Sequence, residues 1–433
     1  MQGKIVRYQS FITTLLLWVL FGSIIGAAVG STSAILLNTN DFLGDTRKAH
    51  PGLIYLLPLG GVLIGFIYQK YGKSSAKGNN LILDQIHSNG KVHRRMGPIV
   101  YLGTFITVLF GGSTGREGAA IQMGGSIAET VNRLFKINPI DTNILLMAGI
   151  SSAFGSAFGA PVTGAVFGME MASLGRLRYE AIVPCFTGSF VGHLVATQFW
   201  RYRHEDLIIE LVPELTATTF VSFVLVCVIF SFVSIIYCQL RHFIQSFSEK
   251  HLKSHMLRGF VGGIFIVALV YIVGSYDYNG RGLEMIEQSF HGNVPPLAFI
   301  AKLVFTAVTM GFGFVGGEAI PLFFIGSTLG NTLSTFVDLP TSFLAAVGLI
   351  AVFCGGANTP IACFILAVEM FDGKAVEYFF LACLISYIFS GHHGLWPSQK
   401  VYDPKSRMET LPSGKTIATI NKQIHQGKFE KDQ

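Results

Sequence analysis

Residues 149–171 read GISSAFGSAFGAPVTGAVFGMEM, and the pattern returns 199 residues later as GLIAVFCGGANTPIACFILAVEM at 348–370. The two stretches align without gaps, and each has a break, a proline after the break and a Glu-Met pair at its end. A second motif repeats at nearly the same offset, since 115–117 (GRE) corresponds to 316–318 (GGE). Two unrelated motifs that repeat together indicate two related halves, at about residues 10–200 and 215–400.

The composition assigns these halves to a membrane. The chain has 433 residues, of which 51% are hydrophobic and only 13% charged, whereas a soluble domain carries roughly 25% charged residues. Residues 215–240 and 259–276 contain no charge and approach or exceed the ~20 residues that cross a bilayer. The sequence therefore predicts an all-α multi-spanning membrane protein and excludes a disordered, fibrous or cytosolic chain.

Other apolar segments are broken by glycine and proline. Irregular backbone at membrane depth is tolerated only where it is buried in protein or lines a cavity. Paired halves with interrupted segments are typical of transporters whose site lies between the repeats near the bilayer midplane. We therefore expect the broken helices to surround the functional site.

A glycine-rich stretch at 111–125, GGSTGREGAAIQMGG, places an acid and a base where a helix begins. Glycines let backbone N–H groups approach a ligand, and the start of a helix attracts anions. The carboxylate of Glu117 would occupy the anion's place when ionised and vacate it when protonated. The alternative, of about equal weight, is that Glu117 caps the helix and pairs with Arg116.

Three further helix starts carry the same kind of signal. They lie at 155–170, at 311–321 (GFGFVGGEAIP) and at 77–81 (KGNNL), and we expect all four to converge on one dehydrated anion. Asn79 in the last of these is either a helix cap or an anion ligand. Glu170 and its repeat partner Glu369 are either proton relays or structural groups, and their equivalent positions favour hydrogen bonds that tie helix ends.

Together these motifs resemble the CLC family of chloride channels and anion/proton exchangers, over about residues 10–400. The resemblance implies an inverted-repeat helical fold whose broken helices converge on an anion site, in a homodimer with one pathway per subunit. It also implies that Glu117 is the gating glutamate, which blocks the anion path and carries the proton. The anion-binding positions that it implies are Asn79, Gly115, Arg116, Gly118, Glu318, Ala319, Ile320 and Trp396.

The chain departs from the usual family motifs at four places. Asn79 stands where a serine is usual, Ala319 replaces a phenylalanine, and Trp396 replaces a tyrosine. Met171 stands where chloride exchangers have an internal proton-accepting glutamate. Several of these features resemble the bacterial fluoride/proton exchanger branch. The resemblance implies a halide transporter, with chloride/proton antiport expected; a fluoride/proton antiporter and a passive chloride channel gated by Glu117 are the alternatives.

The net charge of +6 comes from basic clusters between apolar segments, which the positive-inside rule explains without nucleic acid. We expect a cell (inner) membrane protein with cytoplasmic N- and C-termini, a transmembrane domain over 1–400 and a short cytoplasmic polar tail over 401–433. The expected partners are chloride or fluoride, protons, the lipid bilayer and a second copy of the chain. We expect no enzyme activity, cofactor or metal, because histidines at segment edges lack ligand spacing. Transport is not expected to be driven by ATP, because no Walker motif occurs.

Overall fold

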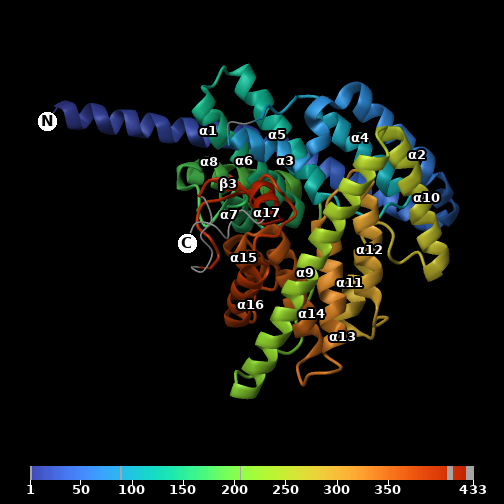
Figure 1. Cartoon of the computed structure of the whole chain (residues 1–433). Coiled ribbons are helices and arrows are strands. Elements are labelled where there is room, and N and C mark those ends of the chain that lie inside the picture. The colour runs from blue at the N-terminus through green and yellow to red at the C-terminus, as the bar shows by residue number, and fades with distance from the viewer. Residues whose placement is uncertain (1, 88–89, 205, 407–412, 426–433) are drawn as a thin grey trace.

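The computed structural model describes residues 2–87, 90–204, 206–406 and 413–425, and it is helical almost throughout (Figure 1). The first half contains eight α-helices. They are α1 (Gln2–Ala49), α2 (Leu57–Ile67), α3 (Asn79–Ile86), α4 (Met96–Leu109), α5 (Glu117–Leu134), α6 (Pro139–Phe158), α7 (Pro161–Glu170) and α8 (Ile182–Leu194). Short 3-10 turns at Pro51–Leu56, Lys73–Lys77 and Tyr179–Ala181 and π-helical turns at Tyr68–Gly72 and Val195–Phe199 adjoin them.

The second half repeats this order of long and short helices. It comprises α9 (Ala217–His251), α10 (His255–Val273), α11 (Leu283–His291), α12 (Ala298–Gly311), α13 (Ala319–Leu333), α14 (Thr341–Ala357), α15 (Pro360–Met370) and α16 (Val376–Phe389). Five helical segments of the described chain are long and apolar enough to cross a membrane, at Phe11–Ala49, Pro51–Lys77, Tyr179–Phe199, Ala217–His251 and His255–Val273. The predicted all-α multi-spanning architecture with broken helices is confirmed.

Equivalent helices of the two halves pack in equivalent ways. A Cβ added to Gly124 of α5 would lie 2.4 Å from the carbonyl oxygen of Gly149 in α6. In the second half, a Cβ added to Gly326 of α13 would lie 2.0 Å from the carbonyl oxygen of Gly348 in α14. Because no side chain fits at either contact, glycine allows both helix pairs to approach backbone to backbone, as small residues do in membrane interfaces.

The central break falls at the same point of each half. α6 ends before Gly159, whose φ is 72°, and α14 ends before Asn358, whose φ is 58°. The left-handed conformation terminates a helix, and glycine and asparagine adopt it most readily. Pro161 and Pro360 then begin α7 and α15, at a helix position where the missing N–H costs nothing.

Two glutamates join the halves across these breaks. Glu170 at the end of α7 accepts hydrogen bonds from the first amides of α15, Ile361 N (3.2 Å) and Ala362 N (2.8 Å). Reciprocally, Glu369 of α15 accepts them from Val162 N (2.9 Å) and Thr163 N (2.7 Å) at the start of α7. The hydrogen-bonding role expected of both glutamates is confirmed, and each carboxylate caps a helix of the opposite half.

The C-terminal segment folds back onto the helical domain. Strand β2 (Lys400–Val401) pairs in parallel with β1 (Ser173–Leu174) and antiparallel with β3 (Lys415–Thr416), which leads into α17 (Ile417–His425). Leu174, Val401, Ile417 and Ile420 form a small apolar cluster there. The segment therefore lies beside the residues that follow α7 (Figure 1).

Candidate functional site

The starts of α5 and α13 meet at the centre of the molecule. Gly115 N donates to Gly317 O at 2.7 Å and Gly317 N donates to Gly115 O at 2.8 Å, which forms an antiparallel bridge between the halves. A Cβ added to Gly118 would lie 3.0 Å from Gly317 Cα. Glycine at these positions lets the two repeat-related loops touch, so two of the expected helix starts do converge.

Glu117 is the first residue of α5, and its side chain is 3% exposed. Its Oε2 accepts a hydrogen bond from Arg116 N at 3.0 Å, so the carboxylate folds over the start of its own helix. A Cβ at Gly115 would lie only 2.5 Å from that oxygen. The carboxylate thus occupies the position where a helix start would bind an anion.

Arg116 points away from the bridge into an ionic cluster. Its Nη1 donates to Asp41 Oδ1 at 2.6 Å and to Leu37 O at 3.1 Å, and Nη2 donates to the hydroxyl of Tyr202. Arg281 pairs with the same Asp41 oxygen at 2.5 Å. Arg116 Nε lies 3.8 Å from Glu117 Oε1, which is beyond hydrogen-bond length. The two guanidinium groups therefore share one carboxylate, and the cluster keeps an excess of positive charge beside Glu117.

Residues next to the glycine bridge line two separate cavities. The larger, of about 340 Å³, is lined by Gly316 and Glu318, and the smaller, of about 70 Å³, by Glu117 and Ile320. His204 also lines the smaller cavity, and burial, reinforced by the charge of Arg116, lowers its pKa to about 4. His204 is therefore neutral near pH 7. Glu117 supplies the carboxylate among the described residues that line this cavity.

Asn79 and Trp396 both line the larger cavity. A Cβ on Gly118 would lie 3.6 Å from Asn79 Nδ2, so the amide reaches the start of α5. Asn79 Oδ1 is buried and has no hydrogen-bond partner within the described part of the chain. Trp396 is 6% exposed and packs edge-on against Phe167, with ring centroids 6.1 Å apart. An unpartnered amide oxygen at a cavity wall is compatible with a ligand position.

Glu318 is held by the neighbouring helix α9. Its Oε1 accepts a hydrogen bond from the hydroxyl of Tyr237 at 2.9 Å and pairs with Arg241 Nε at 3.2 Å. Ala319, the first residue of α13, is buried beside it. Glu318 therefore lines the larger cavity with its charge already compensated.

The structure brings the sequence-predicted residues into two groups. Asn79, Glu318 and Trp396 line the larger cavity; Arg116, Glu117 and Ile320 line the smaller one; Gly115 and Gly118 form the contact between α5 and α13. The expectation that all four helix starts converge is wrong for α7. Its first amides are capped by Glu369 and so are not available to an anion.

Sequence reasoning missed the residues that support the bridge. Lys302 of α12 is fully buried and donates to Tyr278 O (3.1 Å) and Gly280 O (2.6 Å). Gly280 in turn accepts from Thr114 N at 3.2 Å. A lone lysine inside the apolar run 296–316 was the available signal, because an ionisable residue in a membrane segment has a function or a partner. Asp41, Tyr202 and Tyr237 gave no comparable signal.

Known proteins with similar sequences include chloride channels and chloride exchangers. A family model described as voltage gated chloride channel matches residues 60–391. A chloride/fluoride channel protein of Pseudomonas syringae pv. tomato is 38% identical over 415 residues, covering 94% of this chain and 91% of that protein. The H(+)/Cl(-) exchange transporter ClcA of Vibrio parahaemolyticus is 25% identical, with 81% of each chain covered.

Solved structures agree with the sequence relatives. A crystal structure described as a CLC-type fluoride/proton antiporter has a TM-score of 0.86 at 28% identity, covering 89% of this chain and 98% of that one. A slow cyanobacterial Cl-/H+ antiporter has a TM-score of 0.73 at 18% identity, covering 97% and 98%, and shows the shared fold. With the paired halves, the glycine bridge and the glutamate at the start of α5 in place, this chain belongs to the CLC family of voltage gated chloride channels.

Proposed function

We propose that the protein is a proton-coupled halide antiporter in which Glu117 is both gate and proton carrier. The observation that supports this most is the buried carboxylate of Glu117, which folds over the start of α5 and faces the smaller cavity. When ionised it blocks the place that an anion would take. Protonation removes its charge, so the helix start no longer holds it, and a halide binds there instead.

The anion pathway that we propose runs from the larger cavity to the smaller one. Asn79 and Trp396 line its wider part, Glu318 with Ala319 flanks the start of α13, and Gly115 and Gly118 keep the helix starts in contact. Ile320 and Arg116 border the smaller cavity. Backbone amides at helix starts give this path its affinity for anions without a metal or cofactor.

Chloride and fluoride are the two candidate substrates. Chloride follows from the family and from the relatives named as Cl-/H+ exchangers. Fluoride is favoured by the relative named as a chloride/fluoride channel protein and by the structural neighbour described as a fluoride/proton antiporter. Asn79 in the cavity wall, where the family usually has serine, is the feature of this chain that supports fluoride.

The experiment is anion efflux from liposomes that contain purified protein, with chloride and fluoride compared under one gradient and external pH recorded. An antiporter moves protons against the halide, so a halide gradient shifts pH even when the membrane potential is clamped. Efflux without a proton shift under clamped potential would instead identify a passive channel. No efflux of either ion would overturn the proposal.

We further propose that the protein lies in the cell (inner) membrane as a homodimer, with both termini and the 401–433 tail in the cytoplasm. The basic loops and the family resemblance support this orientation and assembly. Light scattering of the detergent-solubilised protein tests the dimer, and accessibility of single cysteines at the termini to a membrane-impermeant reagent tests the orientation. Labelling of the termini from outside intact cells would contradict it.

A further inference from the structure

A second site lies away from the ion pathway, between α1, α4 and α5. A groove of about 490 Å³ opens there, and its lining shares no residue with either cavity beside Glu117. The lining is largely apolar, including Ile35, Pro98, Tyr101, Leu102 and Ile127. Ile35 and Leu102 are 39% and 49% exposed on these membrane helices, so the groove faces the lipid side of the protein.

A strongly basic pocket of about 450 Å³ adjoins one end of this groove. Its lining is entirely basic side chains and histidine: Lys73, His93, Arg94, Arg95 and Arg133. Arg94 lines both the pocket and the groove, so the two adjoin at this side chain. One surface thus offers positive charge at a helix end and apolar walls along the membrane helices.

Most of this charge is uncompensated. Arg133 Nε pairs with Glu129 Oε1 at 2.5 Å. The side chains of Lys73, Arg94 and Arg95, in contrast, have no hydrogen bond or ion pair with any residue that the structure describes, and no carboxylate lines the pocket. Neighbouring cations that repel one another favour an anionic ligand.

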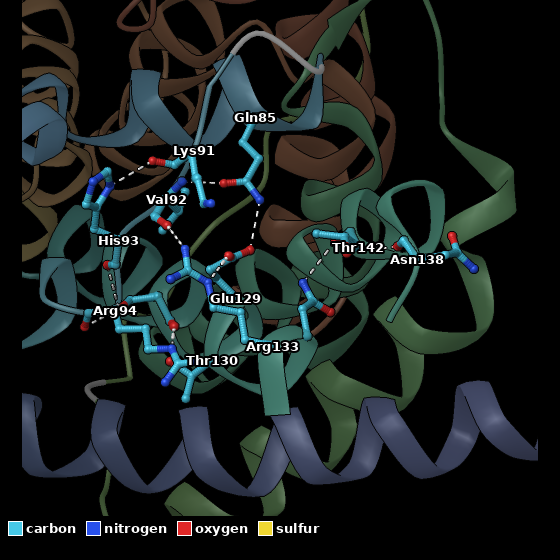
Figure 2. Close-up of polar contacts among 12 residues, drawn as sticks. Gln85, Lys91, Val92, His93, Arg94, Glu129, Thr130, Arg133, Asn138 and Thr142 are labelled. Carbon is cyan, nitrogen blue, oxygen red and sulfur yellow. Dashed lines mark hydrogen bonds and ion pairs between the residues drawn. The ribbon is translucent and has the colours of Figure 1, made fainter. Parts of the chain in front are cut away.

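The segment that carries Arg94 and Arg95 is held in a defined position. Figure 2 shows Gln85, Glu129 and Arg133 linked in a chain: Gln85 Nε2 donates to Glu129 Oε2 at 2.9 Å, and Arg133 Nη2 donates to Val92 O at 3.1 Å. Val92 N donates to Gln85 Oε1, which completes a closed ring of hydrogen bonds among these four residues. Ser126 Oγ of α5 donates to Arg94 O at 2.9 Å. Arg94 and Arg95 are therefore presented by a backbone that hydrogen bonds hold in place, which lowers the entropic cost of binding.

We propose that the pocket and groove together bind one anionic phospholipid. The phosphate would lie against Arg94, Arg95 and Lys73, and an acyl chain would lie in the groove along Leu102 and Ile127. Basic pockets at the ends of membrane helices attract acidic headgroups, and the adjoining apolar walls are what distinguish a lipid from a free anion as occupant. The site is independent of the transport function proposed above.

The test uses native mass spectrometry of the full-length protein, with phosphatidylglycerol and phosphatidylcholine of identical acyl chains as probes, and glycerophosphoglycerol as the headgroup without chains. We expect phosphatidylglycerol to bind and phosphatidylcholine not to compete. Arg94→Gln/Arg95→Gln should weaken phosphatidylglycerol binding roughly 30-fold, because each basic side chain near an acidic lipid contributes about fivefold. Thr130→Trp, which narrows the groove beside Arg94, should weaken binding of the lipid but not of the headgroup.

The matched control is Lys250→Gln/Lys253→Gln, which removes two exposed charges at the end of α9 and lies outside the pocket. It should leave lipid binding within about twofold of the unmodified protein. Equal weakening by the control pair would reduce the effect to overall charge and overturn the site. Equal binding of the two lipids, or headgroup binding as tight as lipid binding, would overturn it as well.

Discussion

The starts of α5 and α13 are related by the internal repeat, yet their glutamates are held in opposite ways. Glu117 contacts a main-chain amide of its own helix start and faces a cavity. Glu318 is fastened to Tyr237 and Arg241 of α9. The same motif therefore yields a carboxylate that a main-chain amide holds in one half and one that two side chains of α9 hold in the other. The difference comes from what the neighbouring helix presents and not from the motif itself.

The largest expected effect follows from removing the charge of Glu117, the proposed gate. Glu117→Gln should abolish proton movement, because an amide of the same shape carries no titratable proton. Halide and proton fluxes in liposomes measure this, and Glu287→Gln, an exposed site on α11, is the matched control. Intact pH-driven halide accumulation by Glu117→Gln would show that the proton takes another route.

Glu318→Gln should act first on stability. Removing one partner of a buried ion pair costs about 3 kcal/mol, because it leaves Arg241 uncompensated. The apparent Tm of the detergent-solubilised protein should fall, and Glu318→Gln/Arg241→Gln should recover most of the loss. If Glu318→Gln melts like the unmodified protein but loses proton coupling as Glu117→Gln does, the two carboxylates share one role and the contrast between the halves fails.

The different surroundings of Glu117 and Glu318 could not be predicted from the sequence. Repeats, broken segments and an acidic residue at a glycine-rich helix start are local patterns, so the fold and the place of Glu117 at the start of α5 were predictable from them. Tyr237, Arg241 and Asp41 gain their roles only where helices far apart in the chain meet, and no spacing encodes that meeting. For the same reason, the sequence predicted hydrogen-bonded helix ends at Glu170 and Glu369 but not that each caps the opposite half.

Trp396→Ala tests whether the larger cavity narrows at the indole. If Trp396 is a constriction, its truncation should raise halide flux and weaken proton coupling, since the larger cavity that the indole lines becomes wider. As a membrane-interface anchor, it should cost some stability and leave the ratio of halide to proton unchanged. Fluxes normalised to folded protein decide between the two, and unaltered coupling would assign the residue to anchoring.

A smaller effect is expected at the third helix start. Asn79→Ser removes an amide near Gly118 and should change the fluoride-to-chloride flux ratio by about fivefold, the value of one hydrogen bond of about 1 kcal/mol. Asn38→Ser is the control, because Asn38 is exposed on α1 and lines neither cavity. An unchanged flux ratio in Asn79→Ser would show that Asn79 has only a structural role at the helix start.

The crossed caps at the central breaks restrict how the protein can move. Glu170 and Glu369 make five hydrogen bonds to helix starts of the opposite half, counting that of Thr163 Oγ1. Rocking one repeat against the other, the usual route to alternating access, would break all five together. For the antiporter proposed above, we therefore expect access to alternate through side-chain movement while the two halves stay in contact.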